Sequence, residues 1–288
     1  MTRPAKLEPF HLDLHLHDTH VSVAGMRRDG RRTPLLFLHG FGSTKEDYAD
    51  VIQHAALDDH PVLAYDAPGC GATGCSDHSV LSIPFLVDVA RAVLDAHGIE
   101  RCHLVGHSMG GLTALILADR EPARVAGFVD IEGNVAPEDC FLSRQIVSHS
   151  HPDPAAFFEE FRARVWQSGY HSSSLFASSL DHKVRPEAVR PIFESMVELS
   201  DHGHLMLRFL GLPLPRMFMY GEQNRSLSYL TTLRDNGVEL AEIPHSAHFP
   251  MYSNARDVVA DHRLRHPRRP SSRRRPVTAE PQAAASGR

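Results

Sequence analysis

The stretch of sequence that decides the fold is residues 102–111, which read CHLVGHSMGG. A short apolar run leads to Gly106, Ser108 follows in a turn, and a leucine- and alanine-rich segment that favours a helix begins after Gly110. Only glycine tolerates the crowding on either side of so tight a strand-to-helix turn, and the strained backbone pushes the serine hydroxyl out of the sheet. The pattern predicts a nucleophilic Ser108, with a purely structural serine in a glycine-rich turn as the alternative.

Two other motifs accompany this turn. The apolar run of residues 34–38 ends in HGFG at residues 39–42, and residues 66–71 read DAPGCG. With the G-x-S-x-G turn, these motifs resemble the α/β-hydrolase superfamily over roughly residues 10–265. The resemblance implies a serine-nucleophile member, of esterase or lactonase type, that carries a helical cap.

The same resemblance implies an oxyanion hole. In the superfamily, the residue after His-Gly and the residue after the nucleophile donate their backbone N–H groups, which here belong to Phe41 and Met109. Fixed donors of this kind are worth about 3–4 kcal/mol each where negative charge develops on oxygen. Met109 also opens the predicted helix, so its N–H is one of the donors without an intrahelical partner.

The rest of the chain alternates between strand-like and helix-like segments. Strands are expected at residues 10–16, 34–38, 61–65, 102–107, 124–131, 215–221 and 238–243. Helices are expected at residues 82–97 and 226–236, and from a capping box at residues 43–46 to about residue 57, with a hairpin-like loop at residues 25–33. This alternation predicts an α/β fold with a mostly parallel sheet covered by helices on both faces, and the resemblance implies eight strands.

Residues 133–211 interrupt the alternation. Within them, Asp153-Pro154 is a helix start, and a second helix is expected from about residue 187 to residue 199. The resemblance implies that this interruption is an inserted helical cap. The expected organisation is a core of residues 1–132 and 212–265, a cap of residues 133–211, and a disordered Arg-, Pro- and Ala-rich tail of residues 266–288.

The tail is expected to be dispensable for catalysis. Residues 263–288 carry eight arginines and one glutamate, so an anion-binding arm and a solvated extension are both possible interpretations. Removing residues 267–288 should leave kcat/KM and the melting temperature nearly unchanged, because a polar segment beyond the last predicted helix contributes no core contacts. A fall of more than about 5 °C in melting temperature would show that the segment docks on the core.

The candidate base lies after the last predicted strand. The segment that follows reads PHSAHFPM, over residues 244–251, and the superfamily places its catalytic histidine in this loop. The resemblance favours His248, because His245 is too close to the end of the strand. Ala247 stands where a glycine is usual, which is a departure from the family pattern.

The triad acid must be ionised, because it orients the imidazole and stabilises the imidazolium. The usual superfamily position, three residues after Gly221, is Asn224, which cannot take this role. Some relatives, including haloalkane dehalogenases, place the acid after the strand that precedes the cap, where this chain has Glu132. We predict Glu132, with Asp130 and Glu222 as the alternatives.

The nucleophile decides among the reactions of the superfamily. Dehalogenases and epoxide hydrolases of this fold need an aspartate at the nucleophile elbow, whereas a serine indicates acyl chemistry. The expected reaction is carboxylesterase-like hydrolysis of an ester, thioester or lactone. Carbon–carbon bond hydrolysis or perhydrolysis on the same triad, and a ligand receptor with slow turnover, are the alternatives. No metal or organic cofactor is implied, and the histidines of residues 11–20 are interpreted as solvated side chains.

Composition sets broader limits. The chain has 288 residues, 42% hydrophobic and 23% charged, which is ordinary for an enzyme with one large core. No apolar run approaches the length of a membrane span and the first residues lack a secretion-signal pattern, so a cytoplasmic location is expected. The four cysteines are expected to be reduced. The expected partner is a small apolar ester or related acyl compound, without specific nucleic-acid binding, and the oligomeric state stays open.

Overall fold

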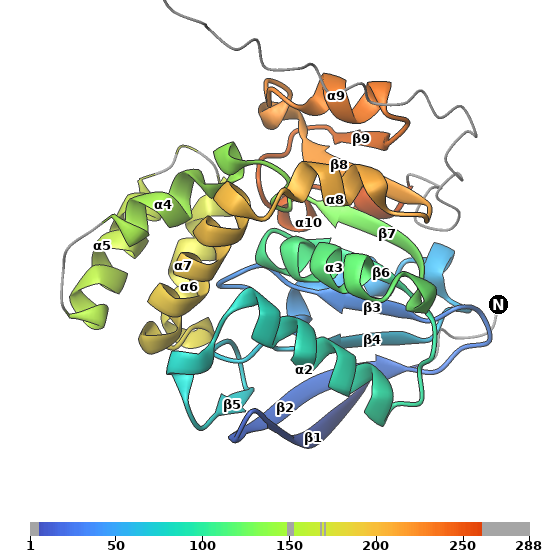
Figure 1. Cartoon of the computed structure of the whole chain (residues 1–288), viewed down its shortest axis with the longest axis horizontal. Coiled ribbons are helices and arrows are strands. Elements are labelled where there is room, and N and C mark those ends of the chain that lie inside the picture. The colour runs from blue at the N-terminus through green and yellow to red at the C-terminus, as the bar shows by residue number, and fades with distance from the viewer. Residues whose placement is uncertain (1–5, 149–152, 168, 170, 261–288) are drawn as a thin grey trace, which may run out of the picture.

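The computed structural model describes residues 6–148, 153–167, 169 and 171–260 (Figure 1). Its strands are β1 (Glu8–Leu16), β2 (Thr19–Arg28), β3 (Leu35–Leu38), β4 (Val62–Tyr65), β5 (Gly74–Cys75), β6 (Cys102–His107), β7 (Val125–Ile131), β8 (Arg216–Gly221) and β9 (Glu239–Ile243). In the described part of the chain they form one sheet in the order β1-β2-β4-β3-β6-β7-β8-β9, with the short β5 beside β2. β1 and β2 are antiparallel, and the strands from β4 to β9 in this order are parallel. The predicted mostly parallel sheet is confirmed, with β5 added to its eight strands.

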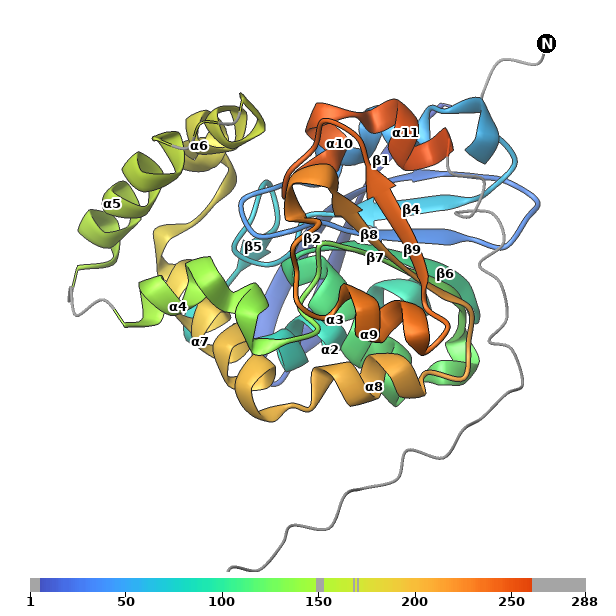
Figure 2. The same cartoon turned by 90° about the horizontal axis from the view of Figure 1, so that it is seen from above.

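Helices cover both faces of the sheet (Figure 2). One face carries α2 (Ile83–Ala96), α3 (Met109–Arg120), α8 (Leu205–Gly211) and α9 (Leu230–Asp235). The other carries α1 (Ala49–Ile52), α10 (Pro250–Ser253) and α11 (Ala255–Ala260), with α1 packed against α11. Because the central strands are covered on both sides, most of their residues are apolar and buried. All six residues of β8 are buried, including Arg216.

Four more helices stand to one side of the sheet (Figure 1). They are α4 (Phe141–Val147), α5 (Pro154–Trp166), α6 (His171–Lys183) and α7 (Pro186–His202), and they lie in the chain between β7 and β8. The end of α6 is tied to the core, because Lys183 Nζ lies 2.7 Å from Asp47 Oδ1 and 5.7 Å from the centre of the Tyr252 ring. The division into core and cap stays a prediction, and the predicted tail, residues 266–288, lies outside the described residues.

Two helix starts form as their sequences predict. The N–H of Phe85 donates to Ser82 Oγ at 3.3 Å at the beginning of α2. The N–H of Ala155 donates to Asp153 Oδ1 at 3.0 Å at the beginning of α5, with Pro154 as the first helical residue. These caps depend on neighbours in sequence, so the residue pattern alone is sufficient to locate them.

Two sequence predictions are wrong. The segment of residues 25–33 is not all loop, because β2 continues to Arg28 and pairs with β4, and the buried Arg28 guanidinium donates to the carbonyl of Ile52 at 2.8 Å. The helix expected from residue 43 to residue 57 is instead α1 between two 3-10 turns. Its cap lies one residue later than expected, where the Thr44 N–H donates to Asp47 Oδ2 at 2.7 Å.

Three general features of the described residues bear on function. All four cysteines are free, and three of them are buried. Across residues 6–260, apart from the short gaps noted above, no helix combines the length and the apolar character needed to cross a membrane. The same residues contain no group of three or more His, Cys, Asp or Glu side chains arranged to hold a metal ion.

Candidate active site

Ser108 lies at the tip of the turn between β6 and α3. Its φ is 51°, in a region that side chains rarely adopt, and its N–H donates to the carbonyl of Ile131 at 3.0 Å. A Cβ on Gly106 would lie 2.4 Å from Gly110 O, and one on Gly110 would lie 2.1 Å from Leu38 O. The two glycines are therefore required by close backbone approach, and the strand-turn-helix geometry predicted from the sequence is present.

The His-Gly loop after β3 is held by His39. The N–H of Ala67 donates to His39 Nε2 at 2.8 Å, so Nδ1 carries the proton and donates to the carbonyl of Gly40, also at 2.8 Å. Burial lowers the pKa of His39, which keeps the ring neutral. The ring thus anchors the backbone immediately before Phe41, one of the two predicted oxyanion donors.

His248 and Glu132 meet at the carboxyl edge of the sheet. Glu132 directly follows β7 with φ of 51°, and its Oε2 lies 3.7 Å from Nδ1 of His248, which lies between β9 and α10. The carboxylate is 5% exposed and the imidazole 44% exposed, so the acid is shielded while the base faces open space. The backbone N–H of Gly221 donates to Glu132 Oε1 at 2.7 Å, and Asn224 Nδ2 lies 2.9 Å from both carboxylate oxygens.

The two alternative acids lie elsewhere. Asp130 is fully buried, and a Cβ on Gly133 would lie 1.9 Å from its Oδ1. Burial raises the pKa of Asp130 well above its ordinary value, which favours the neutral form of its side chain. Glu222 accepts from the backbone N–H of His245 at 2.8 Å and pairs with Arg225 at 2.6 Å. Of the three carboxyl groups that the sequence offers, Glu132 is the one that meets His248.

Asn224 has a place that the sequence analysis did not identify. It occupies the position where the superfamily usually has its acid, and the sequence analysis excludes it as the triad acid because an amide cannot ionise. In the structure it donates to both oxygens of Glu132, so it holds the carboxylate that faces His248. The sequence could have indicated this contact, because it has an amide, Asn224, at the usual position of the acid and a carboxylate, Glu132, directly after the strand that precedes the insertion.

A cavity of about 590 Å³ extends from these residues to helices α4, α5, α6 and α7. Its polar floor includes Ser108, Glu132 and His248, and most of its remaining wall is apolar. The aromatic and aliphatic lining residues are Phe41, Phe141, Leu142, Phe161, Val165, Phe176, Phe193, Met196, Leu227 and Phe249. Because the predicted nucleophile, base, acid and one oxyanion residue share this cavity, an apolar molecule bound there would reach all of them.

Asp139 is another carboxyl group on the cavity wall, beside Glu132 and Glu138. Its Oδ2 accepts from the backbone N–H groups of Val135 and Ala136, each at 2.8 Å, and the hydroxyl of Tyr229 donates to Oδ1 at 2.7 Å. Burial raises the pKa of Asp139 to about 6, although these donors oppose the shift. The group therefore titrates close to neutral pH.

The pKa of Asp139 predicts a pH-dependent stability difference. An exposed aspartate has a pKa of about 3.9, so the higher pKa in the folded protein means that folding favours the protonated side chain. The free energy of unfolding is therefore highest below about pH 4 and falls as the pH rises to about 6. The Asp139→Asn variant stays neutral, so it should gain about 2–3 kcal/mol in free energy of unfolding relative to wild type between pH 4 and pH 7. Urea unfolding of both proteins at these two pH values measures the change. A difference that does not vary with pH would contradict the assigned pKa.

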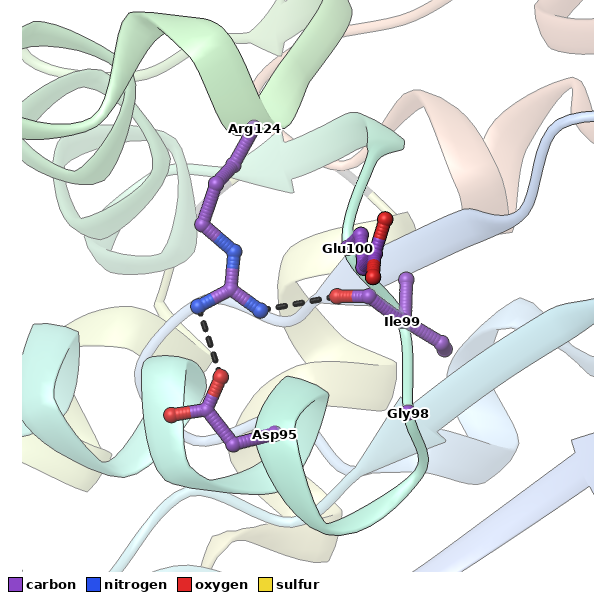
Figure 3. Close-up of a pocket in the computed structure, with 5 residues that line it drawn as sticks. All are labelled: Asp95, Gly98, Ile99, Glu100 and Arg124. Carbon is purple, nitrogen blue, oxygen red and sulfur yellow. Dashed lines mark hydrogen bonds and ion pairs between the residues drawn. The ribbon is translucent and has the colours of Figure 1, made fainter.

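Another cavity, of about 380 Å³, lies at the opposite edge of the sheet. It is formed where α2 leads into β6 and just before β7 begins, at Asp95, Gly98, Ile99, Glu100 and Arg124 (Figure 3). Arg124 donates to Asp95 and to the carbonyl of Ile99, each at 2.7 Å, so its guanidinium is already engaged. Ligands of open α/β sheets bind at the carboxyl ends of the strands, and this cavity lies at the amino ends.

Comparisons with known proteins agree with the fold. Residues 33–169 match the family described as alpha/beta hydrolase fold. A pimeloyl-[acyl-carrier protein] methyl ester esterase of Aeromonas hydrophila is 30% identical over 138 residues, which cover 48% of this chain and 51% of that protein. The chain spans about half the length of the first curated relatives that it matches.

Two solved structures are similar across most of the chain. A thermophilic esterase from Thermogutta terrifontis has a TM-score of 0.68 at 18% identity, covering 88% of this chain and 97% of that one. An N-acyl homoserine lactonase complexed with N-butanoyl homoserine also has a TM-score of 0.68 at 18% identity, covering 87% and 94%. At this identity the likeness concerns the fold. Together with the family match over residues 33–169 and the strand order, it shows that this chain has the α/β-hydrolase fold.

Proposed function

We propose that the protein is a serine hydrolase that cleaves a carboxylic ester, thioester or lactone through an acyl-enzyme. The observation that carries the proposal is the approach of Glu132 to His248 Nδ1, 3.7 Å, at a cavity that Ser108 also lines. Nucleophile, base and orienting carboxylate are the parts of a catalytic triad, which is recognised by geometry and roles.

In the proposed mechanism, Ser108 Oγ attacks the carbonyl carbon and His248 takes its proton. Glu132 holds the Nδ1–H of His248 and stabilises the imidazolium that forms. His248 then protonates the leaving alcohol or thiol, and a water activated by His248 cleaves the acyl-enzyme in the second half of the reaction. The separation of 3.7 Å is longer than a hydrogen bond, so the proposed mechanism requires the carboxylate and the imidazole to approach more closely during the reaction.

The negative oxygen of each tetrahedral intermediate is assigned to the N–H groups of Phe41 and Met109. Phe41 borders the cavity beside Ser108, and Met109 is the first residue of α3. The N–H at a helix start has no intrahelical acceptor and lies at the positive end of the helix dipole, which suits it to an oxyanion. This assignment explains why the nucleophile stands at the start of a buried helix.

The wall of the cavity supports a substrate with an apolar acyl or alcohol group. Six phenylalanines line it, and they favour hydrocarbon over charged groups. The names of the similar proteins, a methyl ester esterase and an N-acyl homoserine lactonase, support ester and lactone substrates as the first to be tried.

A burst experiment tests the proposal. With p-nitrophenyl acetate in excess, an acyl-enzyme mechanism releases about one equivalent of nitrophenol per active site when deacylation is slower than acylation, followed by steady turnover. A panel of p-nitrophenyl esters of increasing chain length then measures the preference for apolar acyl groups. Binding of esters without any turnover would contradict the hydrolase assignment and favour a receptor of the same fold.

A further inference from the structure

The histidine that precedes the proposed nucleophile contacts the loop of the proposed base. His107 is the last residue of β6, and only 1% of the residue is exposed. Its Nε2 lies 2.6 Å from the backbone carbonyl oxygen of His248, across 141 residues of sequence. The centres of the two rings are 4.9 Å apart. The strand that leads to Ser108 therefore also contacts the main chain of His248.

The partners of the ring settle its protonation. A carbonyl oxygen only accepts, so Nε2 of His107 carries the proton and donates it to His248. Nδ1 is buried and has no hydrogen-bond partner, so a proton there would be an unpaired buried donor. Burial, and next to it the neighbouring His248, lower the pKa of His107 well below its ordinary value. The ring is a neutral Nε2–H imidazole at neutral pH.

Gly40 confines this ring from the other side. A Cβ added to Gly40 would lie 2.5 Å from His107 Nδ1 and 3.1 Å from Ser108 Cβ, so only glycine lets the His-Gly loop pass this close. The ring of Phe249 lies 5.5 Å from that of His107 on the side of the base loop. His107 is thus held between the two loops that border Ser108.

We propose that His107 is a positioning residue, which fixes the backbone of His248 and thereby places its imidazole relative to Ser108. The inference rests on the proposed function. His107 and Ser108 share a peptide bond, so the hydrogen bond to His248 joins nucleophile and base through one side chain. A misplacement of about 1 Å at a catalytic group lowers rates by up to about 10²-fold, which is the scale of effect that loss of this bond should have.

Two variants of similar size separate positioning from packing. His107→Leu removes the donor, whereas His107→Gln retains an N–H donor at comparable reach. With an alkyl ester as substrate, His107→Leu should lower kcat by about 10- to 100-fold with KM changed less than about 3-fold, and His107→Gln should stay within about 5-fold of wild type. Melting temperatures of all three proteins are measured alongside.

Comparing two leaving groups distinguishes a misplaced His248 from a general structural defect, because a general defect lowers kcat/KM equally for both. A misplaced His248 protonates the leaving group poorly, so His107→Leu should lose more kcat/KM with an ethyl ester than with the p-nitrophenyl ester of the same acid, whose leaving group departs without protonation. Equal losses on both esters, or a His107→Gln variant as impaired as His107→Leu, would overturn the proposal.

A measurement on the unaltered protein covers the case in which the leucine variant does not fold. Long-range ¹H–¹⁵N correlation spectra of the histidine rings should show His107 as a neutral Nε2–H tautomer at neutral pH, and a neutral ring with its proton on Nδ1 would refute the inference. Ser108→Ala is the reference for the function itself. If that variant keeps full esterase activity, the proposed function fails; if it is inactive while His107→Leu behaves as wild type, the inference alone fails.

Discussion

The Ser108→Ala variant is expected to lose at least about 10³-fold in kcat on any ester that the wild type cleaves, because the acyl-enzyme cannot form without the hydroxyl. The proposed oxyanion donors and the apolar cavity remain, so residual hydrolysis above the uncatalysed rate is expected. A fluorophosphonate probe, which reacts only with an activated serine, should label wild type at Ser108 and should not label the variant. Mass spectrometry of the labelled peptide locates the modification.

Ser173 offers a matched control for this experiment. It lines the same cavity, on α6, but stands at no strand-to-helix turn. Ser173→Ala should therefore keep both the labelling and most of the activity. Labelling that survives in Ser108→Ala, or that disappears in Ser173→Ala alone, would show that the nucleophile has been assigned to the wrong residue.

The Glu132→Gln variant is expected to lose at least about 10²-fold in kcat. The amide keeps the size of the side chain but removes the charge, and its NH₂ group favours the wrong tautomer of His248; the equivalent change in a serine protease costs about 10⁴-fold. The environment of Glu132 adds to the effect, because Gly221 N–H and Asn224 Nδ2 both donate toward the carboxylate and an amide offers them one acceptor oxygen in place of two. Steady-state kinetics on an aryl ester measure the loss.

Three further substitutions show whether the effect is specific to Glu132. Asp130→Asn puts a neutral amide in place of a buried acid whose raised pKa favours its neutral form, and Glu222→Gln changes a group that binds His245. Both variants should therefore remain within a few-fold of wild type. Asn224→Ala should cost less than Glu132→Gln, since it loosens the carboxylate without discharging it. A nearly inactive Asp130→Asn or Glu222→Gln, beside an active Glu132→Gln, would show that the acid is one of the other two.

The features that the sequence alone determined are local. The turn at Ser108 depends on Gly106 and Gly110, and the helix starts at Ser82 and Asp153 depend on caps and on a proline within the next few residues. The buried strands are recognisable as apolar runs because both of their faces are covered. In each case the interacting groups are neighbours in the chain, so the residue pattern contains the information.

Contacts between distant segments decided the rest. β2 extends to Arg28 because it pairs with β4. The helix expected up to residue 57 ends at Ile52, whose carbonyl accepts a hydrogen bond from Arg28. The sequence left three candidates for the triad acid because residue spacing does not reveal the surroundings of a carboxyl group. In the structure, Asp130 is fully buried, Glu222 accepts a hydrogen bond from the backbone of His245, and Glu132 faces His248. Only the pairing of β7 with β8, and of β8 with β9, brings Glu132, Asn224 and His248 to one edge of the sheet, where their hydrogen bonds and burial distinguish them.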